Sequence, residues 1–169
     1  MEWLKQLDEL EGVYRKLPRI AGQIAVRFSK ERFKTKDWVD NRTEPWGNRK
    51  DNFANPIMVG KQSGALRRSI RIVRVTPRYV IIGSDKPYAR IHNEGGSIPV
   101  TEKMKKFFYW KYLNAKEANK KKDAEFWFNM YISKKKNIRI PRRQFMGNST
   151  ILSKKIEREA LAMTKQAIK

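Results

Sequence analysis

The sequence of 169 residues contains no cysteine and a single histidine. The absence of cysteine excludes disulfides, a thiol nucleophile and cysteine-ligated zinc. Only 17 acidic residues are present, and no group of them has the spacing of a calcium-binding loop. We therefore expect no metal and no other cofactor. No apolar run approaches the roughly 18 residues of a membrane-spanning helix, and the acidic start of the chain does not resemble a secretory signal.

Catalytic chemistry has few candidates in this sequence. His92 has the side chain best suited to act as a general base near neutral pH. Its neighbours Asn93 and Glu94 are poor orienting partners, because adjacent residues on a helix do not face each other. A Ser-His-acid triad stays open, since triads are defined by geometry, although no nucleophile elbow is present. Residues 60–64 lack the order of a phosphate-binding loop. We predict a protein that is not an enzyme, in which His92 hydrogen-bonds its own turn or stacks at a contact.

Basic residues dominate the charge, with 39 Lys and Arg against 17 acids and a net charge of +22. This balance favours acidic partners, and composition alone leaves open a nucleic acid, an anionic membrane surface or an acidic protein surface. In residues 101–143 the bases alternate with aromatic side chains, a combination that neutralises phosphates and stacks bases. The candidate contacts to DNA or to an acidic partner are Lys120, Lys121, Lys122, Lys134, Lys135 and Lys136. No nucleic-acid-binding signature accompanies them.

The length is typical of one domain, and the hydrophobic content of 40% is sufficient for a core. We therefore predict a single domain over residues 1–169, with a loop at about 34–62 and a basic aromatic insertion at about 101–136. The loop is dense in turn-forming residues and contains Trp38, Trp46 and Phe53. These aromatic side chains either anchor a partner or tether the loop to its own domain.

Apolar residues recur every three or four positions near the N-terminus and predict a helix over residues 2 to about 33. Pro18 is expected to kink this helix or to start a second one. The resulting stripe is interpreted as core packing, and the alternative is an interface helix that packs on a neighbouring subunit. Its residues are Leu4, Leu7, Leu10, Tyr14 and Leu17, continued beyond Pro18 by Ile20, Ile24 and Phe28.

Shorter elements follow. A helical turn is expected at 63–69, and branched apolar residues at 70–75 and 79–84 predict a β-hairpin. The remaining expectations are a short helix or turn at 88–94, an edge strand at 97–100, a helix from 101 to about 120, helix or strand at 126–132, a strand at 137–140 and a C-terminal helix capped by Asn148, Ser149 or Thr150. The fold class is α+β, with a small, mainly antiparallel sheet flanked by N-terminal, central and C-terminal helices.

Four short motifs occur in order. The sequence reads SGALRRS at 63–69, VIIGS at 80–84, YARIHNEGG at 88–96 and IPRRQFMGNS at 140–149. In this order, around a predicted strand pair, they resemble the Mu-like phage virion morphogenesis and tail-completion proteins. The resemblance covers about residues 62–152, and the segment at about 100–137 departs from it by being longer, more basic and more aromatic. The matching positions are Gly64, Leu66, Ser69, Gly83, Tyr88, Ala89, His92, Gly95, Gly96, Pro141, Arg143 and Phe145.

The resemblance implies a structural component of a tailed-phage virion, either a tail terminator or a neck protein at the head–tail junction. It implies a homo-oligomeric ring, expected to be a hexamer, that assembles in the host cytoplasm and stays in the virion. The implied partners are other copies of the chain, tail-tube and neck or connector proteins, and packaged DNA in the channel, without a membrane. Gly95 and Gly96 would permit a sharp turn, while Arg143 and Phe145 would anchor the late strand through a charge-assisted bond and a buried ring. The alternative function is a basic nucleic-acid-binding protein without catalysis.

Overall fold

A computed structural model describes residues 2–47, 58 and 64–168. Part of the predicted loop, including Phe53, and Ser63 of the first motif lie outside the described residues. The fold is α+β, as predicted. The elements are α1 (Glu2–Thr35), β1 (Asp37–Val39), β2 (Thr43–Pro45), α2 (Ala65–Ser69), β3 (Arg71–Val75), β4 (Val80–Gly83), α3 (Ala89–Glu94), β5 (Gly96–Pro99), α4 (Glu102–Glu117), α5 (Lys121–Ile132), β6 (Asn137–Ile140) and α6 (Thr150–Ala167).

The strands pair as three separate two-stranded antiparallel sheets, β1–β2, β3–β4 and β5–β6, where the sequence predicted one small sheet. The chain divides into two compact units. The first unit contains Met1–Glu94 and Pro141–Lys169, and the second contains Gly95–Ile140. The basic aromatic segment at 101–136 therefore falls within the second unit. The description of the whole chain as one domain stays a prediction.

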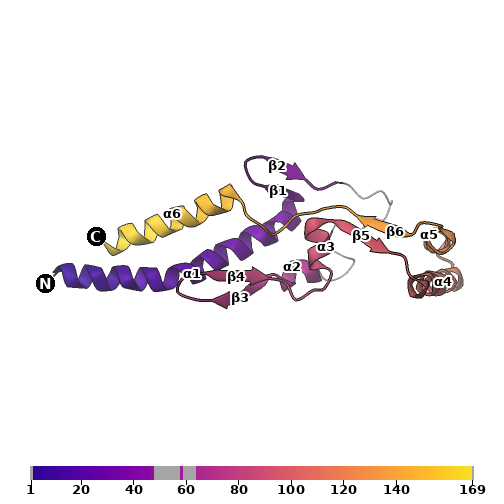
Figure 1. The fold of residues 1–169 in the computed structure, drawn as a ribbon, viewed down its shortest axis with the longest axis horizontal. Helices are drawn as coiled ribbons and strands as arrows, with labels where there is room; N and C mark the ends of the chain where they lie inside the picture. Colours follow the sequence, from indigo (N-terminus) through magenta and orange to yellow (C-terminus); the bar gives the residue numbers. More distant parts are fainter. Residues whose placement is uncertain (1, 48–57, 59–63, 169) are drawn as a thin grey trace. The chain divides into compact units, whose positions relative to one another are not determined.

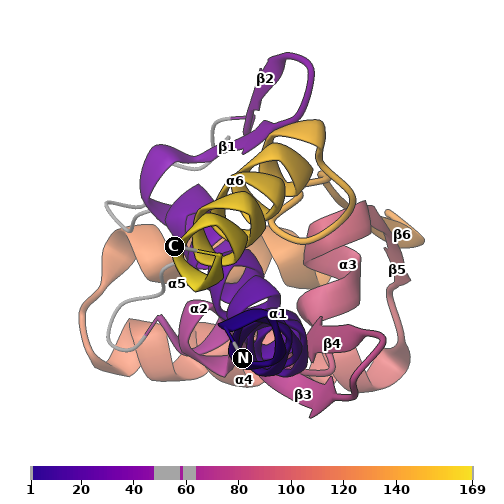
Figure 2. The same cartoon turned by 90° about the vertical axis from the view of Figure 1, so that its left-hand side faces the viewer.

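The first unit is organised around α1. This helix continues through Pro18, although proline lacks the backbone donor that a helix interior uses. Figures 1 and 2 show that α6 runs along one side of α1 and that the β3–β4 hairpin lies on another side. Packing on both neighbours stabilises the middle of α1, because tertiary burial supplies most helix stability in proteins.

The apolar stripe near the start of α1 is not part of the core. Leu4, Leu7 and Tyr14 are 42%, 51% and 72% exposed, so the preferred interpretation as core packing is wrong for these three residues. Further along the stripe, Phe28 is buried against the Trp38 ring, with 5.7 Å between ring centroids. Only the second half of α1 therefore contributes to the core, and the first half presents apolar side chains to the surroundings.

Gly22 allows the β3–β4 hairpin to approach α1 closely. A Cβ atom at this position would lie 2.7 Å from Val80 Cγ2 and 2.9 Å from Ile72 Cδ1. Both distances are shorter than carbon atoms tolerate, and the branched Val80 side chain cannot rotate away freely. Gly12, on the same helix, has no atom within 4 Å of the equivalent position.

The Gly22→Ala substitution is expected to lower the free energy of unfolding by up to about 2 kcal/mol. Overpacking costs about 1–3 kcal/mol, and the better helix propensity of alanine offsets about 1 kcal/mol. The matched control, Gly12→Ala, should instead raise stability by up to about 1 kcal/mol. Urea denaturation of the two variants measures the difference, and an equal gain in both would contradict the close approach of the hairpin.

A β-hairpin occupies part of the segment that was predicted as a loop. Strands β1 and β2 pair antiparallel, with Trp38 opposite Glu44. The buried guanidinium of Arg32, near the end of α1, forms an ion pair of 2.7 Å with Asp37. Ser149 caps α6 by accepting a hydrogen bond from the Leu152 amide at 3.2 Å, and its hydroxyl donates to the carbonyl of Val39 at 2.8 Å. Ser149 thus caps the N-terminus of α6 and also anchors the β1–β2 hairpin.

The second unit consists of the β5–β6 pair and the helices α4 and α5. Thr101 caps α4 by accepting a hydrogen bond from the Met104 amide. Residues 126–132, which the sequence left open between helix and strand, lie within α5. The rings of Phe108 and Trp127 stack between α4 and α5 with centroids 6.0 Å apart. Phe108 is buried, whereas Trp110 on the same helix is 53% exposed.

Candidate functional site

The core of the first unit brings together segments that are distant in the sequence. Its buried members are Phe33, Trp46, Leu66, Ile70, Ala89 and Phe145. Three of them belong to the motif positions, namely Leu66, Ala89 and Phe145, and the Phe145 side chain has no exposed surface. The Phe33 ring lies 4.9 Å from the Phe145 ring and 5.5 Å from that of Trp46, measured between centroids. The motif series therefore converges on one packed cluster.

Trp46 is held inside this cluster by a hydrogen bond. Its indole Nε1 donates to the backbone carbonyl of Gln144 at 2.9 Å, and the residue is 6% exposed. Trp38 is also buried, against α1. The sequence left open whether the aromatic residues at 34–62 anchor a partner or tether the loop to its own domain. Trp38 and Trp46 tether it to the first unit.

Asn93 joins the third motif to the fourth. Its side-chain Oδ1 accepts hydrogen bonds from the backbone amides of Phe145 and Met146, each at 2.9 Å, and its Nδ2 donates to the carbonyl of Met146 at 3.0 Å. The backbone amide of Arg143 donates to the carbonyl of His92 at 2.9 Å. These four bonds fix residues 143–146 against α3. Sequence reasoning considered Asn93 only as a partner of His92. No local pattern shows that a side chain will hydrogen-bond to backbone groups more than 50 residues away.

His92 is half-buried beside Arg143. Burial lowers the pKa of the imidazole below its ordinary value of 6.5, and the charge of Arg143 lowers the pKa further. The buried Nδ1 atom has no hydrogen-bond partner among the described residues. The ring meets that of Tyr88 edge-on, with centroids 6.0 Å apart. The imidazole is therefore neutral at pH 7, and within the described part of the chain no hydroxyl or carboxylate is placed to form a triad with it.

Acid is expected to destabilise the first unit through His92. Because the folded state holds the lower pKa, the unfolded chain binds the proton more readily, and stability is lost as pH falls from about 6.5 through the folded pKa. The His92→Gln variant should lose this part of the pH dependence. Urea denaturation from about pH 7.5 to 5 measures it. An NMR titration reports the imidazole directly, because the chain has one histidine, and titration at or above pH 6.5 would contradict the account.

The remaining motif positions have other roles in the fold. The hydroxyl of Ser69 donates to the carbonyl of Leu66 at 2.7 Å and lies 2.6 Å from the Ser84 hydroxyl. Gly64 precedes α2 with a φ of 52°, and Gly95 follows α3 with a φ of 77°, both in the region that favours glycine. Gly83 lies at the end of β4, and Gly96 lies at the start of β5 with a φ of 154°. Pro141 is exposed, whereas Arg143 is buried and its guanidinium donates a hydrogen bond to the carbonyl of Gly47 at 3.4 Å.

The six candidate lysines belong to the second unit. Lys120, Lys121 and Lys122 lie at the start of α5, and Lys134, Lys135 and Lys136 lie between α5 and β6. All six are exposed. Most motif positions therefore belong to the first unit, whereas the basic segments on α5 and after it belong to the second unit.

A family model described as the phage virion morphogenesis family matches residues 2–164. The chain belongs to this family. The match confirms the resemblance drawn from the four motifs. It also includes residues 34–62, which precede the motifs, and the segment at about 100–137 that departs from their pattern. No curated protein and no solved structure matches the chain. The family is one of phage assembly rather than catalysis, which agrees with the prediction that the protein is not an enzyme.

Two further observations describe this virion morphogenesis protein. Among the described residues, no three His, Cys, Asp or Glu side chains gather closely enough to hold a metal ion. In the same part of the chain, no helix combines the length and the apolar character needed to cross a membrane.

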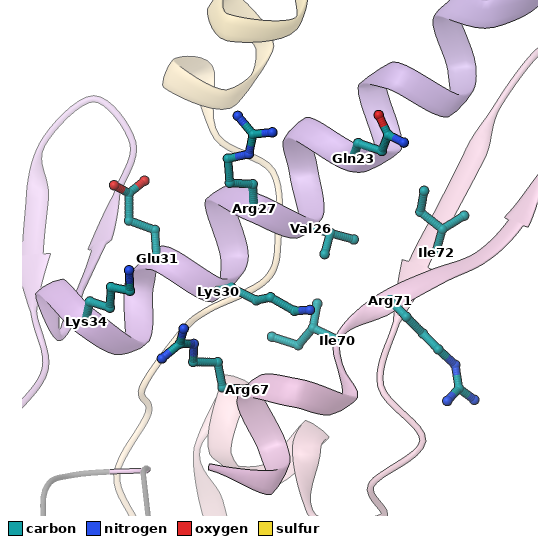
Figure 3. Close-up of a pocket in the computed structure, with 10 residues that line it drawn as sticks. All are labelled: Gln23, Val26, Arg27, Lys30, Glu31, Lys34, Arg67, Ile70, Arg71 and Ile72. Atoms are coloured by element: carbon teal, nitrogen blue, oxygen red, sulfur yellow. The ribbon is translucent and has the colours of Figure 1, made fainter.

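The first unit of the protein also contains a basic groove of about 690 Å³ between α1, α2 and β3. Figure 3 shows Val26 and Lys30 extending from α1 to the side where Ile70 lies, with Arg67 approaching from α2. The lining side chains are Gln23, Val26, Arg27, Lys30, Glu31, Lys34, Arg67, Ile70, Arg71 and Ile72. Five of these are cationic and one is acidic. The groove can therefore bind an acidic segment that also presents an apolar side chain.

Proposed function

We propose that this protein is a tail-completion or neck protein that forms a ring at the head–tail junction of a tailed phage. The observation that carries the proposal is the match to the phage virion morphogenesis family over residues 2–164. The resemblance of its motifs to tail-completion proteins supports the more specific role. The ring is expected to be a hexamer with tail-tube and connector proteins as neighbours, and packaged DNA passes through its channel.

Exposed apolar side chains support a role in an assembly. In the first unit Trp3 and Leu7 are more than half exposed, and in the second unit Trp110 and Ile132 are also more than half exposed. Large apolar surfaces on an isolated chain are typical of interaction sites. A ring subunit needs two different faces that meet by rotation. Both units therefore present apolar side chains that are available for contacts with neighbouring copies of the chain and with other virion proteins.

The exposed lysines around α5 favour contact with DNA as a second candidate function. They lie near exposed aromatic side chains, including Phe128 and Tyr131. A protein whose main role is nucleic-acid binding should lose affinity for DNA steeply as salt rises, and particles should form without it.

A phage with a premature stop codon in the gene for this chain tests the proposal. Electron microscopy of the lysate should show heads and tails that fail to join. Tails of irregular length would indicate a terminator, and heads that lose DNA would indicate a neck protein. Supplying the intact protein from a plasmid should restore complete particles. Complete, infectious particles without the protein would overturn the proposal.

A further inference from the structure

We propose that the acidic N-terminal part of α1 in one copy of the chain docks into the basic groove of a second copy. The inference rests on the proposed ring and names the contact that would build it. Two exposed surfaces of the first unit support the inference. One is the N-terminal part of α1, and the other is the basic groove between α1, α2 and β3.

The docking segment is residues 2–11. It contains four acids, Glu2, Asp8, Glu9 and Glu11, and one base, Lys5, so it carries a charge of −3 within a chain of +22. The same turns expose Trp3 by 58% and Leu7 by 51%. Large apolar side chains flanked by acids on one helix are typical of a helix that binds in a groove with a basic rim.

The groove has the complementary properties. Four of its cations, Arg27, Lys30, Lys34 and Arg67, form no ion pair with any described residue, whereas Arg71 pairs with Asp85 at 3.3 Å. Its acid, Glu31, pairs with Arg32 at 3.4 Å and so does not neutralise these cations.

The floor of the groove is apolar. Ile70 is fully buried beneath it, and Val26 and Ile72 are partly exposed at its surface. The volume of about 690 Å³ lies within the range of grooves that hold a bound group, and it accommodates a tryptophan or leucine side chain. A phosphate backbone would satisfy the cations but would leave this floor uncovered. An acidic segment with apolar anchors satisfies both.

The occupant has to come from another copy. Leu7 and Arg27 lie on the same continuous helix, α1, and 20 residues of helix span about 30 Å. A chain therefore cannot place its own N-terminal turns in its own groove while α1 stays helical. A contact between two different patches repeats from copy to copy and closes into a ring when the rotation permits. Docking of α1 into the groove is thus a contact of the kind that a ring requires.

Charge reversal and rescue test this contact in the full-length chain. Asp8 and Glu11 lie four residues after Leu4 and Leu7 and share their face of the helix. We expect Asp8→Lys/Glu11→Lys and Lys30→Glu/Arg67→Glu each to weaken self-association at least about tenfold, because like charges then oppose each other. The four substitutions in one chain should restore association. The control is Lys154→Glu/Arg158→Glu at exposed positions of α6, which should change little.

Sedimentation velocity measures self-association, and circular dichroism verifies that each variant is folded. If the wild-type chain forms rings that neither reversal weakens, the inference is wrong and the proposed function stands. If the wild-type chain does not associate, either alone or in the presence of the phage's own heads and tails, both fail. If the groove reversal abolishes binding of a short DNA duplex while the helix reversal leaves association intact, the groove binds nucleic acid and the inference is overturned.

Disulfide trapping gives a second, independent readout, since the chain has no cysteine. Mixing the Leu7→Cys chain with the Lys30→Cys chain under oxidising conditions should trap a heterodimer, because a disulfide requires Cα atoms within about 7 Å. The control replaces Leu7→Cys with Leu161→Cys, at an exposed position of α6, and should trap none. Trapping of Leu7→Cys chains only with each other would contradict the proposed contact.

Discussion

Replacing Phe145 with alanine is expected to lower the free energy of unfolding by about 3–5 kcal/mol. The side chain has no exposed surface, and its ring lies 4.9 Å from that of Phe33 between centroids. Removing the ring leaves a cavity between α1 and the segment at 143–146. Hydrogen bonds from Asn93 hold this segment against α3, so the cavity can collapse only partly.

Urea denaturation measures the effect of Phe145→Ala. The control is Tyr14→Ala, which removes an aromatic side chain that is 72% exposed in the same unit and should change stability by less than about 0.5 kcal/mol. Similar small changes in both variants would mean that Phe145 is not part of a packed core. A loss of stability in Phe145→Ala should also reduce the number of complete phage particles, since a role in virion assembly requires a folded first unit.

The Asn93→Ala variant is expected to lose about 2–4 kcal/mol of stability. It removes three hydrogen bonds at once and leaves the amides of Phe145 and Met146 without their acceptor. The carbonyl of Met146 keeps only the longer bond from Gln144 Nε2 at 3.4 Å. Each buried polar group left unsatisfied costs about 1–3 kcal/mol, and water that enters the site offsets part of the sum.

Two further variants test the role of Asn93. Asn93→Asp keeps the acceptor for both amides but loses the donor and places a carboxylate next to the carbonyl of Met146, so its stability should lie between those of the wild type and Asn93→Ala. Asn148→Ala, at an exposed position just before the α6 cap, should be nearly neutral. Equal stability of Asn93→Ala and wild type in urea denaturation would exclude Asn93 as the residue that joins the two motifs.

Local sequence patterns correctly predicted the elements that are determined by interactions between neighbouring residues. The β3–β4 hairpin followed from branched apolar residues on either side of a proline turn, and its strands pair with Arg71 opposite Gly83. The C-terminal helix was predicted with three candidate caps, and the structure selects Ser149. Such signals are contained within a few neighbouring residues, because a cap or a turn satisfies its own backbone groups.

Elements that depend on distant contacts were not predictable in the same way. The β1–β2 hairpin lies in a segment without periodicity, and Asp40 in its turn accepts hydrogen bonds from the backbone and hydroxyl of Thr150, 110 residues away. These bonds lower the pKa of Asp40 below its ordinary value. The role of Asn93 has the same origin. A sequence pattern cannot show which backbone groups a distant segment brings to a side chain.

The N-terminal stripe of α1 illustrates a different limit. Periodicity correctly predicted a helix with one apolar face, but it does not distinguish a face buried within the chain from a face that meets another chain. The exposure of Leu7 favours the interface helix over the core helix for this part of α1. The exposed lysines and exposed aromatic residues of the second unit raise the same question, which periodicity does not answer.

The mass of the assembled full-length protein at physiological salt, measured by sedimentation together with electron microscopy of the same sample, tests the central claim most directly. The account predicts a closed ring with rotational symmetry and a mass of about six times the 20.0 kDa of one chain. A species of 20.0 kDa at every concentration, alone and in the presence of the phage's own heads and tails, would contradict it.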